Sequence, residues 1–243
     1  MPRLFVPAEE WGGAEATLTG ESHHYLTRVL RFGAGARVEL FDGRGQEVTA
    51  TIVRVGPRDA VLSLGERRQV TLRALPPVTL MQGLPRAERM DMIVQKATEL
   101  GAARIVPVRA ARSAAGQQGR PERWARIARE AARQCGRAEL PEITPVLPLA
   151  EALATLVPGT RRIVPWEEAP DAEPLVRLVS AERHEGRGVD VLVGPEGGLT
   201  AEEIDLARAA GFAIATLGPR ILRTETAAIA TLALVQGALG GLG

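Results

Sequence analysis

The chain has 243 residues, 45% of them hydrophobic and 24% charged, a composition that excludes a disordered or collagen-like protein. Its formal net charge is only +1, so affinity for nucleic acid has to come from local arginine clusters. Cys135 is the only cysteine, which excludes an internal disulfide and a thiolate zinc cluster, and we expect a buried, inert thiol and no metal site. The sequence lacks both an apolar run of the roughly 20 residues that span a membrane and signal-peptide features, so we expect a cytoplasmic protein without a membrane partner.

Residues 1–72 are predicted to form a small β-barrel-like domain. Three strand patterns follow one another here, VELFDG, QEVTATIVRV and AVLSLGERR, and the pairs Asp42-Gly43 and Gly56-Pro57 mark turns. From Val78 onward, short apolar runs alternate with helical patterns. We therefore expect a domain boundary between Leu72 and Pro76, with residues 73–243 as the second domain.

The second domain is predicted to be an α/β domain with a mostly parallel sheet, because strand patterns alternate with helical ones. The strand patterns are VTLMQG, RIVPV, RRIVPW, VDVLVG and FAIATLG. The helical patterns are RAERMDMIVQKATELG, which ends at Gly101, RPERWARIAREAARQCGR, which opens with Pro121, a helix capped by Thr200 and Glu203, and TAAIATLALVQGAL. Ligands of such folds lie at the carboxyl ends of the strands.

Two loops at such strand ends indicate a ligand site. GPEGG, at 194–198, brings glycines to the start of a helix, where backbone amides are unpaired. It matches neither the dinucleotide nor the Walker pattern, and a tight turn without a ligand is an alternative. TLGPRILRTETA, at 216–227, crowds four polar residues at another helix start, where capping needs only one. The loops converge on one cleft if their strands are neighbours.

GPEGG followed by LGPRILRTETA resembles the closing signature of the bacterial 16S rRNA (uracil-N3)-methyltransferase family, which belongs to the knotted SPOUT methyltransferases. The segments HHYLTRVLR, MDMIVQKATELG and ERWARIAREAARQCGR, with the following LPEI, are similar to further blocks of that family in the same order. One departure is Ala111, since the family more often has an acidic residue before Arg112-Ser113.

The resemblance implies a PUA-like RNA-binding β-barrel over residues 1–72 and a SPOUT methyltransferase domain with a C-terminal trefoil knot over residues 73–243. It implies a homodimer formed through the knotted domain, S-adenosylmethionine as the cofactor, and 16S rRNA or the 30S ribosomal subunit as the partner. The implied reaction is methylation of N3 of a uridine near the decoding centre. Two alternatives stay open: a SPOUT enzyme acting on ribose 2′-oxygen or on another RNA, and a non-catalytic RNA-binding assembly factor.

The resemblance also implies site residues. Those expected to bind the cofactor are Leu192, Gly194, Pro195, Glu196, Gly197, Gly198, Leu217, Gly218, Ile221, Leu222, Thr224, Thr226 and Ala227. Methyl transfer to uracil N3 requires removal of a proton and stabilisation of negative charge on the flanking carbonyl oxygens. Arg223 is the candidate cation and Glu225 the candidate proton acceptor, while a surface ion pair and a helix-start carboxylate are their structural alternatives.

Two basic segments are candidates for contact with RNA. The first contains His24, Tyr25, Arg28 and Arg31. In the second, helical periodicity puts basic side chains opposite an apolar face formed by Trp124, Ile127, Ala131 and Cys135. The basic side chains are Arg123, Arg126, Arg129, Arg133 and Arg137. A solvated charged face is the alternative for both segments.

Overall fold

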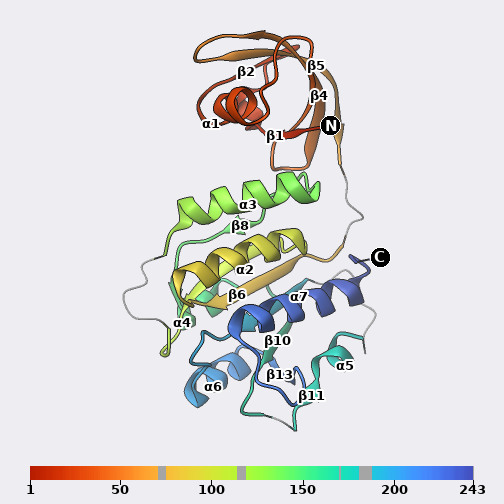
Figure 1. The fold of residues 1–243 in the computed structure, drawn as a ribbon. Coiled ribbons are helices and arrows are strands. Elements are labelled where there is room, and N and C mark those ends of the chain that lie inside the picture. Colours follow the sequence, from red (N-terminus) through yellow and green to blue (C-terminus); the bar gives the residue numbers. More distant parts are fainter. Residues whose placement is uncertain (71–74, 114–118, 170, 181–187, 243) are drawn as a thin grey trace. The chain divides into compact units, whose positions relative to one another are not determined.

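A computed structural model describes residues 1–70, 75–113, 119–169, 171–180 and 188–242 (Figure 1). The chain divides into an N-terminal unit, Met1–Arg73 with Arg129–Leu140, and a C-terminal unit, Ala74–Ala128 with Pro141–Gly243. Most of the predicted boundary between Leu72 and Pro76 lies outside the described residues. The predicted division placed 129–140 with the second domain, whereas this segment is compact with the N-terminal residues.

The N-terminal unit is built on a five-stranded sheet of order β1-β3-β4-β5-β2. Its strands are β1 (Arg3–Phe5), β2 (Glu15–Leu18), β3 (Arg37–Phe41), β4 (Gln46–Val55) and β5 (Ala60–Gln69). The three predicted strands are confirmed as β3, β4 and β5, which pair antiparallel, while β1 runs parallel to β3. Alternating apolar residues such as Val38, Leu40, Val48 and Leu62 are fully buried, so one face of the sheet forms the core.

The HHYLTRVLR segment folds as two consecutive helical turns. A 3-10 turn, η1 (Ala8–Glu10), precedes α1 (Gly20–His24), which continues into the π-helical turn η2 (Tyr25–Val29). Arg31 follows with φ of 55°, the only positive φ outside glycine among the residues that the structure describes. Backbone strain of this kind, next to a π-helical turn, is concentrated at functional sites in proteins.

The C-terminal unit contains an eight-stranded sheet whose main path has the order β11-β13-β10-β12-β6-β7-β8, with β9 paired to β7. The strands are β6 (Val78–Gly83), β7 (Arg104–Arg109), β8 (Glu142–Ile143), β9 (Leu147–Pro148), β10 (Arg161–Pro165), β11 (Glu173–Pro174), β12 (Val189–Val193) and β13 (Ala213–Thr216). Every pairing described is parallel, which confirms the predicted sheet. Strands β8, β9 and β11 were not predicted, because each has only two residues and so shows no periodicity.

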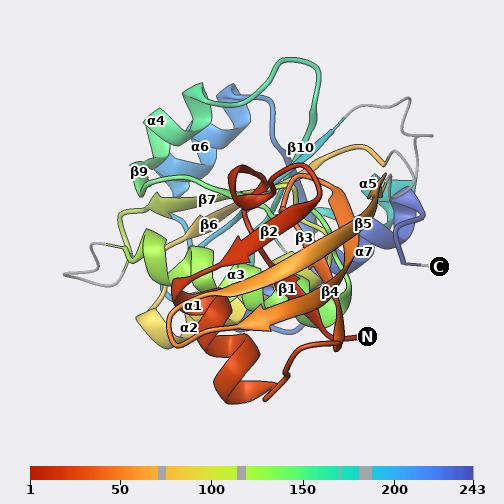
Figure 2. The ribbon, with the colours of Figure 1, turned by 90° about the horizontal axis from the view of Figure 1, so that it is seen from above.

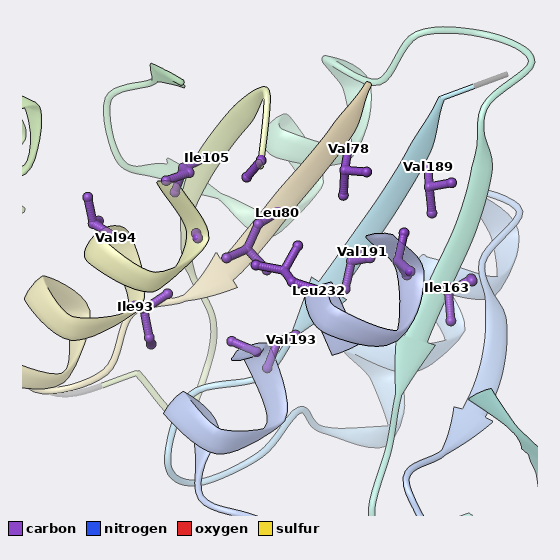
Figure 3. Close-up of a cluster of buried hydrophobic side chains, with 14 of the residues drawn as sticks. Val78, Leu80, Ile93, Val94, Ile105, Ile163, Val189, Val191, Val193 and Leu232 are labelled. Carbon is purple, nitrogen blue, oxygen red and sulfur yellow. The ribbon is translucent and has the colours of Figure 1, made fainter. Parts of the chain in front are cut away.

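Helices cover both faces of this sheet. On one face lie α2 (Ala87–Glu99), α5 (Leu175–Ser180), α7 (Thr224–Leu239) and the first part of α3 (Pro121–Cys135). Leu232 of α7 lies there beside Leu80 of β6 and Val191 of β12 (Figure 3). On the other face, α4 (Leu149–Ala154) and α6 (Ala201–Ala209) lie side by side (Figure 2). Burial on both faces explains why these strands are apolar runs without alternation.

Two of the predicted helix ends are confirmed. The Thr200 hydroxyl accepts a hydrogen bond from the Glu203 amide at 3.3 Å, and the Thr200 amide donates to the Glu203 carboxylate at 3.0 Å, so a capping box opens α6. Gly101 follows α2 with φ of 83°, a left-handed conformation that favours glycine. The six-residue helices α4 and α5 were not predicted, since each spans fewer than two turns.

The prediction for the end of α3 is wrong at two positions. Cys135 is exposed, not buried, because it is the last residue of the helix, where its thiol donates a hydrogen bond to the Ala132 carbonyl of the preceding turn. Arg137 is buried, not part of a basic face, because Gly136 with φ of 83° ends the helical path before it. Burial lowers the pKa of the Arg137 guanidinium.

Candidate functional site

The two loops noted in the sequence meet at one cavity of about 230 Å³ in the C-terminal unit. The loops were expected to converge if the strands before them, β12 and β13, were neighbours. They are not neighbours, because β10 lies between them. The loops meet nevertheless, since all three strands are parallel and end at the same edge of the sheet. The end of β10 and the loop after it also reach the cavity, through Pro165 and Glu167, and neither residue was predicted to belong to the site.

Most of the residues predicted to bind the cofactor line this cavity or a smaller one next to it. Those around the larger cavity are Gly194, Pro195, Glu196, Gly198, Ile221, Leu222, Thr224 and Ala227, together with Arg223. Leu217 and Gly218 line the second cavity, of about 50 Å³, which shares Pro165, Glu167, Leu222 and Ala227 with the first. Leu192, Gly197, Glu225 and Thr226 line neither cavity, and Leu192 is buried in the core beneath α6.

A buried hydrogen-bond network joins the two loops. The Thr224 hydroxyl donates to the Gly194 carbonyl at 2.6 Å, and the Gln82 side-chain nitrogen donates to the Thr224 hydroxyl at 3.0 Å. The same nitrogen lies 2.8 Å from the Gly83 carbonyl and 3.3 Å from that of Gly194. Gln82 is fully buried near the carboxyl end of β6, next to β12. Gln82 was not predicted to belong to the site, although a polar amide at the end of an apolar strand is a signal that the side chain forms hydrogen bonds there.

Four charged side chains lie beside this network. Arg89 of α2 places Nη1 3.3 Å from a carboxylate oxygen of Glu196 and 3.9 Å from one of Glu225, so it faces both loops. Glu225 Oε2 is buried and has no hydrogen-bond partner in the described part of the chain. Arg223 is exposed at the N-cap of α7 and forms no ion pair with any described residue. A guanidinium at the cavity wall is therefore available to a ligand.

The GPEGG loop has no room for side chains on its inner side. Gly198 has φ of 71°, and a Cβ there would collide with the Glu167 carboxylate. At Gly197 a Cβ would lie 2.8 Å from the Cβ of Arg112, whose guanidinium donates to the Gly197 carbonyl at 3.0 Å. Close packing against Arg112 therefore favours glycine at 197, and the left-handed backbone conformation favours glycine at 198.

The Ala111-Arg112-Ser113 segment, where the sequence departs from the family pattern, packs against this loop. The Ala111 amide donates to the Glu203 carboxylate at 2.7 Å, and this carboxylate also belongs to the capping box of α6. A carboxylate is therefore present beside residue 111 although the residue itself is alanine.

The arginines of the two basic segments differ in whether they contact other side chains of the protein. In the N-terminal unit, His24, Arg28 and Arg31 are exposed, whereas the Arg133 guanidinium stacks on the half-buried Tyr25 ring at 4.4 Å. Arg129 lies over the Phe5 ring at 5.5 Å.

In the C-terminal unit, Arg123 pairs with Asp91 at 2.7 Å, a hydrogen bond that raises the pKa of the arginine, while Arg126 is exposed and has no ion pair with any described residue. Arg28, Arg31 and Arg126 are therefore the candidates with an uncompensated charge.

The described part of the chain shows neither a metal-binding cluster nor a membrane-spanning helix. Within the described residues, His, Cys, Asp and Glu side chains form no group of three or more that is suited to a metal ion. None of the described helices combines the length and the apolar character needed to cross a membrane.

Comparison with known proteins identifies the class to which this fold and site belong. The family model of an RNA methyltransferase domain matches residues 73–236, and that of an RNA methyltransferase PUA domain matches residues 18–64. The ribosomal RNA small subunit methyltransferase E of Bacillus subtilis is 30% identical over 97% of this chain and 96% of its own length. The chain therefore belongs to the family of ribosomal RNA small subunit methyltransferase E.

Solved structures agree with this assignment. The ribosomal RNA small subunit methyltransferase E of Neisseria gonorrhoeae, bound to S-adenosyl methionine, is similar with a TM-score of 0.87 and 31% identity, covering 98% of this chain and 97% of that one. A methyltransferase of Legionella pneumophila, in complex with the bound cofactor SAM, is similar with a TM-score of 0.81 and 31% identity, covering 97% of both chains.

Gly198→Ala tests the packing of the GPEGG loop. We expect the free energy of unfolding to fall by about 1–2 kcal/mol or more, because an L-residue is strained at this φ and its Cβ meets Glu167. Urea unfolding measures the change. Gly237→Ala on α7 is the control, since a Cβ at that position would enter open space and alanine favours a helix, so stability should hold or rise. Equal stability of Gly198→Ala and the wild type would contradict the packing argument.

Proposed function

We propose that this protein is an S-adenosylmethionine-dependent methyltransferase that methylates N3 of a specific uridine in 16S rRNA. The observation that carries the proposal is the meeting of GPEGG and LGPRILRTETA at one cavity, because these loops carry the family resemblance and lie where ligands of parallel sheets bind. The names of the family's members and the cofactor bound in two similar structures support it.

The residues around the two cavities fit S-adenosylmethionine. The cavities share Leu222 and Ala227, which suits a ligand with an adenosine part and a methionine part. Trp166 lines the smaller cavity, and its Nε1 is buried without a partner in the described chain, so a donor is ready for a ligand acceptor. The larger cavity is lined by the carboxylates of Glu167 and Glu196 and by the guanidinium groups of Arg89 and Arg223, and groups of both signs suit a methionine part that carries an ammonium and a carboxylate. The bound cofactor supplies a methyl group activated by its positively charged sulfur.

We assign the cofactor to the backbone and apolar groups of the two loops, with the predicted residues Leu192, Gly197 and Thr226 supporting the loops from outside the cavities. Gly218 suits close approach by a ligand, because φ is 101° and the space where a Cβ would lie is open. Arg112 and Arg89 hold the GPEGG loop in place through Gly197 and Glu196.

Arg223 and Glu225 are the proposed catalytic residues. The Arg223 guanidinium stabilises the negative charge that develops on a uracil carbonyl oxygen, and the positive end of the α7 helix dipole acts in the same direction. Glu225 Oε2, which has no hydrogen-bond partner among the described residues, accepts the N3 proton. Arg89 lies 3.9 Å from this oxygen and holds the carboxylate near the cavity.

The remaining assignments concern RNA and assembly. We propose that residues 1–72 act as a PUA-like RNA-binding domain through His24, Tyr25, Arg28 and Arg31, and that Arg123, Arg126, Arg129 and Arg133 assist. Residues 73–243 form the methyltransferase domain, with a C-terminal trefoil knot through which two chains form a homodimer. The partner is 16S rRNA or the 30S ribosomal subunit, in the cytoplasm.

One assay tests the function directly. The protein is incubated with S-adenosylmethionine and either 16S rRNA or 30S subunits, and the RNA is digested to nucleosides for mass spectrometry. 3-Methyluridine is the expected product, whereas a 2′-O-methylated nucleoside would identify a different reaction. The absence of saturable binding heat for S-adenosylmethionine would instead indicate a non-catalytic RNA-binding factor.

Arg223→Lys separates geometry from charge. We expect kcat to fall about tenfold or more with cofactor affinity unchanged, because lysine keeps the charge but loses the planar fork that suits two hydrogen bonds. Single-turnover methylation and calorimetry measure the two quantities. If Arg223 is only a solvated surface charge, lysine should behave as the wild type.

Glu225→Gln tests the proton acceptor. We expect a loss of rate that shrinks as pH rises, because the uracil imide then ionises without help from the protein. The measurement is a pH–rate profile beside that of the wild type. A helix-start carboxylate with no part in proton transfer would give the same pH dependence in both proteins.

Arg28→Ala combined with Arg31→Ala tests the RNA surface. We expect weaker RNA binding with a shallower dependence on salt, because each phosphate contact releases counterions. Filter binding at several salt concentrations measures the slope, and the control is Arg208→Ala on α6, since Arg208 is paired with Asp205 at 3.0 Å and is not among the proposed RNA contacts. An unchanged slope in the double variant would leave these arginines as solvated surface.

A further inference from the structure

The hydroxyl proton of Thr224 is donated to another group of the protein, although the residue lines the cavity. Thr224 is the first residue of α7 and is only 5% exposed. Its hydroxyl proton goes to the Gly194 carbonyl at 2.6 Å, and its oxygen accepts from Gln82 at 3.0 Å. A hydroxyl with one donor and this geometry has no proton left for a ligand. Thr224 therefore donates no hydrogen bond to a ligand, and its contribution to the site is the position of its backbone.

The side-chain amide of Gln82 also forms its hydrogen bonds within the protein. Its side-chain nitrogen lies within 3.3 Å of three oxygens, those of Gly83, Gly194 and Thr224, while Oε1 is buried without a partner in the described chain. The unpaired Oε1 is unfavourable, but an apolar side chain of similar length would leave the oxygens of Gly83, Gly194 and Thr224 without this donor. The contacts of the amide nitrogen explain why a glutamine is here.

We propose that Gln82 and Thr224 are positioning residues that lock the two loops together before any ligand binds. The lock holds the Gly194 end of the GPEGG loop against the first turn of α7, and so sets the place of Arg223, the residue immediately before Thr224. This inference rests on the proposed function, in which Arg223 contacts the reacting uracil. A shift of about 1 Å in such a group lowers a rate as much as 100-fold, so a fixed helix start matters.

The other link between the loops is weaker. Arg89 reaches Glu196 at 3.3 Å and Glu225 at 3.9 Å, and its side chain is one-third exposed. Long, partly solvated ion pairs contribute little because water screens them. The Gln82–Thr224–Gly194 network is buried, and hydrogen bonds there are stronger because the surroundings are less polar.

Thr224→Val is the first test, since valine keeps the shape and removes the hydroxyl. We expect kcat to fall about tenfold or more and S-adenosylmethionine affinity to weaken several-fold in calorimetry, because both cavity walls lose their link. Thr224→Ser keeps the hydroxyl and should restore most of both. Thr231→Val is the matched control: Thr231 is also on α7 and fully buried, but its hydroxyl has no partner among the described residues, so neither quantity should change.

Gln82→Met separates positioning from structure. We expect the melting temperature to fall somewhat, because methionine keeps the length of the side chain but donates no hydrogen bond to the three oxygens, and we expect kcat to fall by more than this loss of stability explains. Hydrogen exchange of the cofactor-free protein should be faster at 194–198 and 224–227 in Gln82→Met and Thr224→Val, and unchanged in Thr231→Val. A fall in kcat that the fraction of unfolded protein fully explains would overturn the proposal.

The double variant Arg223→Lys with Thr224→Val tests whether Thr224 acts through Arg223. We expect its kcat to be close to that of Arg223→Lys alone, since residues that act as a unit are not additive. Losses that multiply would overturn the proposal, as would wild-type kcat and affinity in Thr224→Val. These outcomes differ from failure of the proposed function, in which the wild type itself neither binds S-adenosylmethionine nor methylates RNA.

Discussion

Parallel pairing of the strands in the C-terminal unit is the constraint on which the candidate site depends. Because β6, β10, β12 and β13 run in the same direction, their carboxyl ends lie at one edge of the sheet, and the segments that leave them are gathered there. Four separate pieces of chain thereby supply Gln82, Glu167, Gly194 and Thr224 to one place. The apolar strands and the helices on both faces maintain this arrangement, since each strand is buried on both sides.

Hydrogen bonds between polar groups then hold the loops in one conformation at the edge of the sheet, where apolar packing has brought them together. The sheet brings the loops close together, but burial of apolar surface has no direction and does not select one loop conformation. Directional hydrogen bonds do, and here they come from a glutamine and a threonine buried under the cavity and from Glu203, which joins the start of α6 to the Ala111 segment. Glycines at 197 and 198 complete the loop because neighbouring segments occupy the space of a side chain.

Charge is distributed around the site in a way that separates structural from reactive groups. Arg89 and Arg112 face carboxylates and a carbonyl of the GPEGG loop and its surroundings, so their charges are used within the protein. Arg223, one residue before the buried Thr224, remains exposed at the cavity wall. A buried anchor next to an exposed cation is an effective way to place a flexible side chain, because the backbone at its root is fixed while its guanidinium stays free to meet a ligand.

Residues close together in the chain specify the alternation of strands and helices, the capping box at Thr200 and Glu203, the glycine after α2 and the two ligand loops, so these features could be predicted from the sequence. Other features became visible only in the folded chain: β10 separates β12 from β13, Gln82, Arg89 and Glu167 belong to the site, and Gly136 turns Arg137 inward. These features depend on which distant segments become neighbours, and strand order leaves no periodic trace in the sequence, so local patterns could not reveal them.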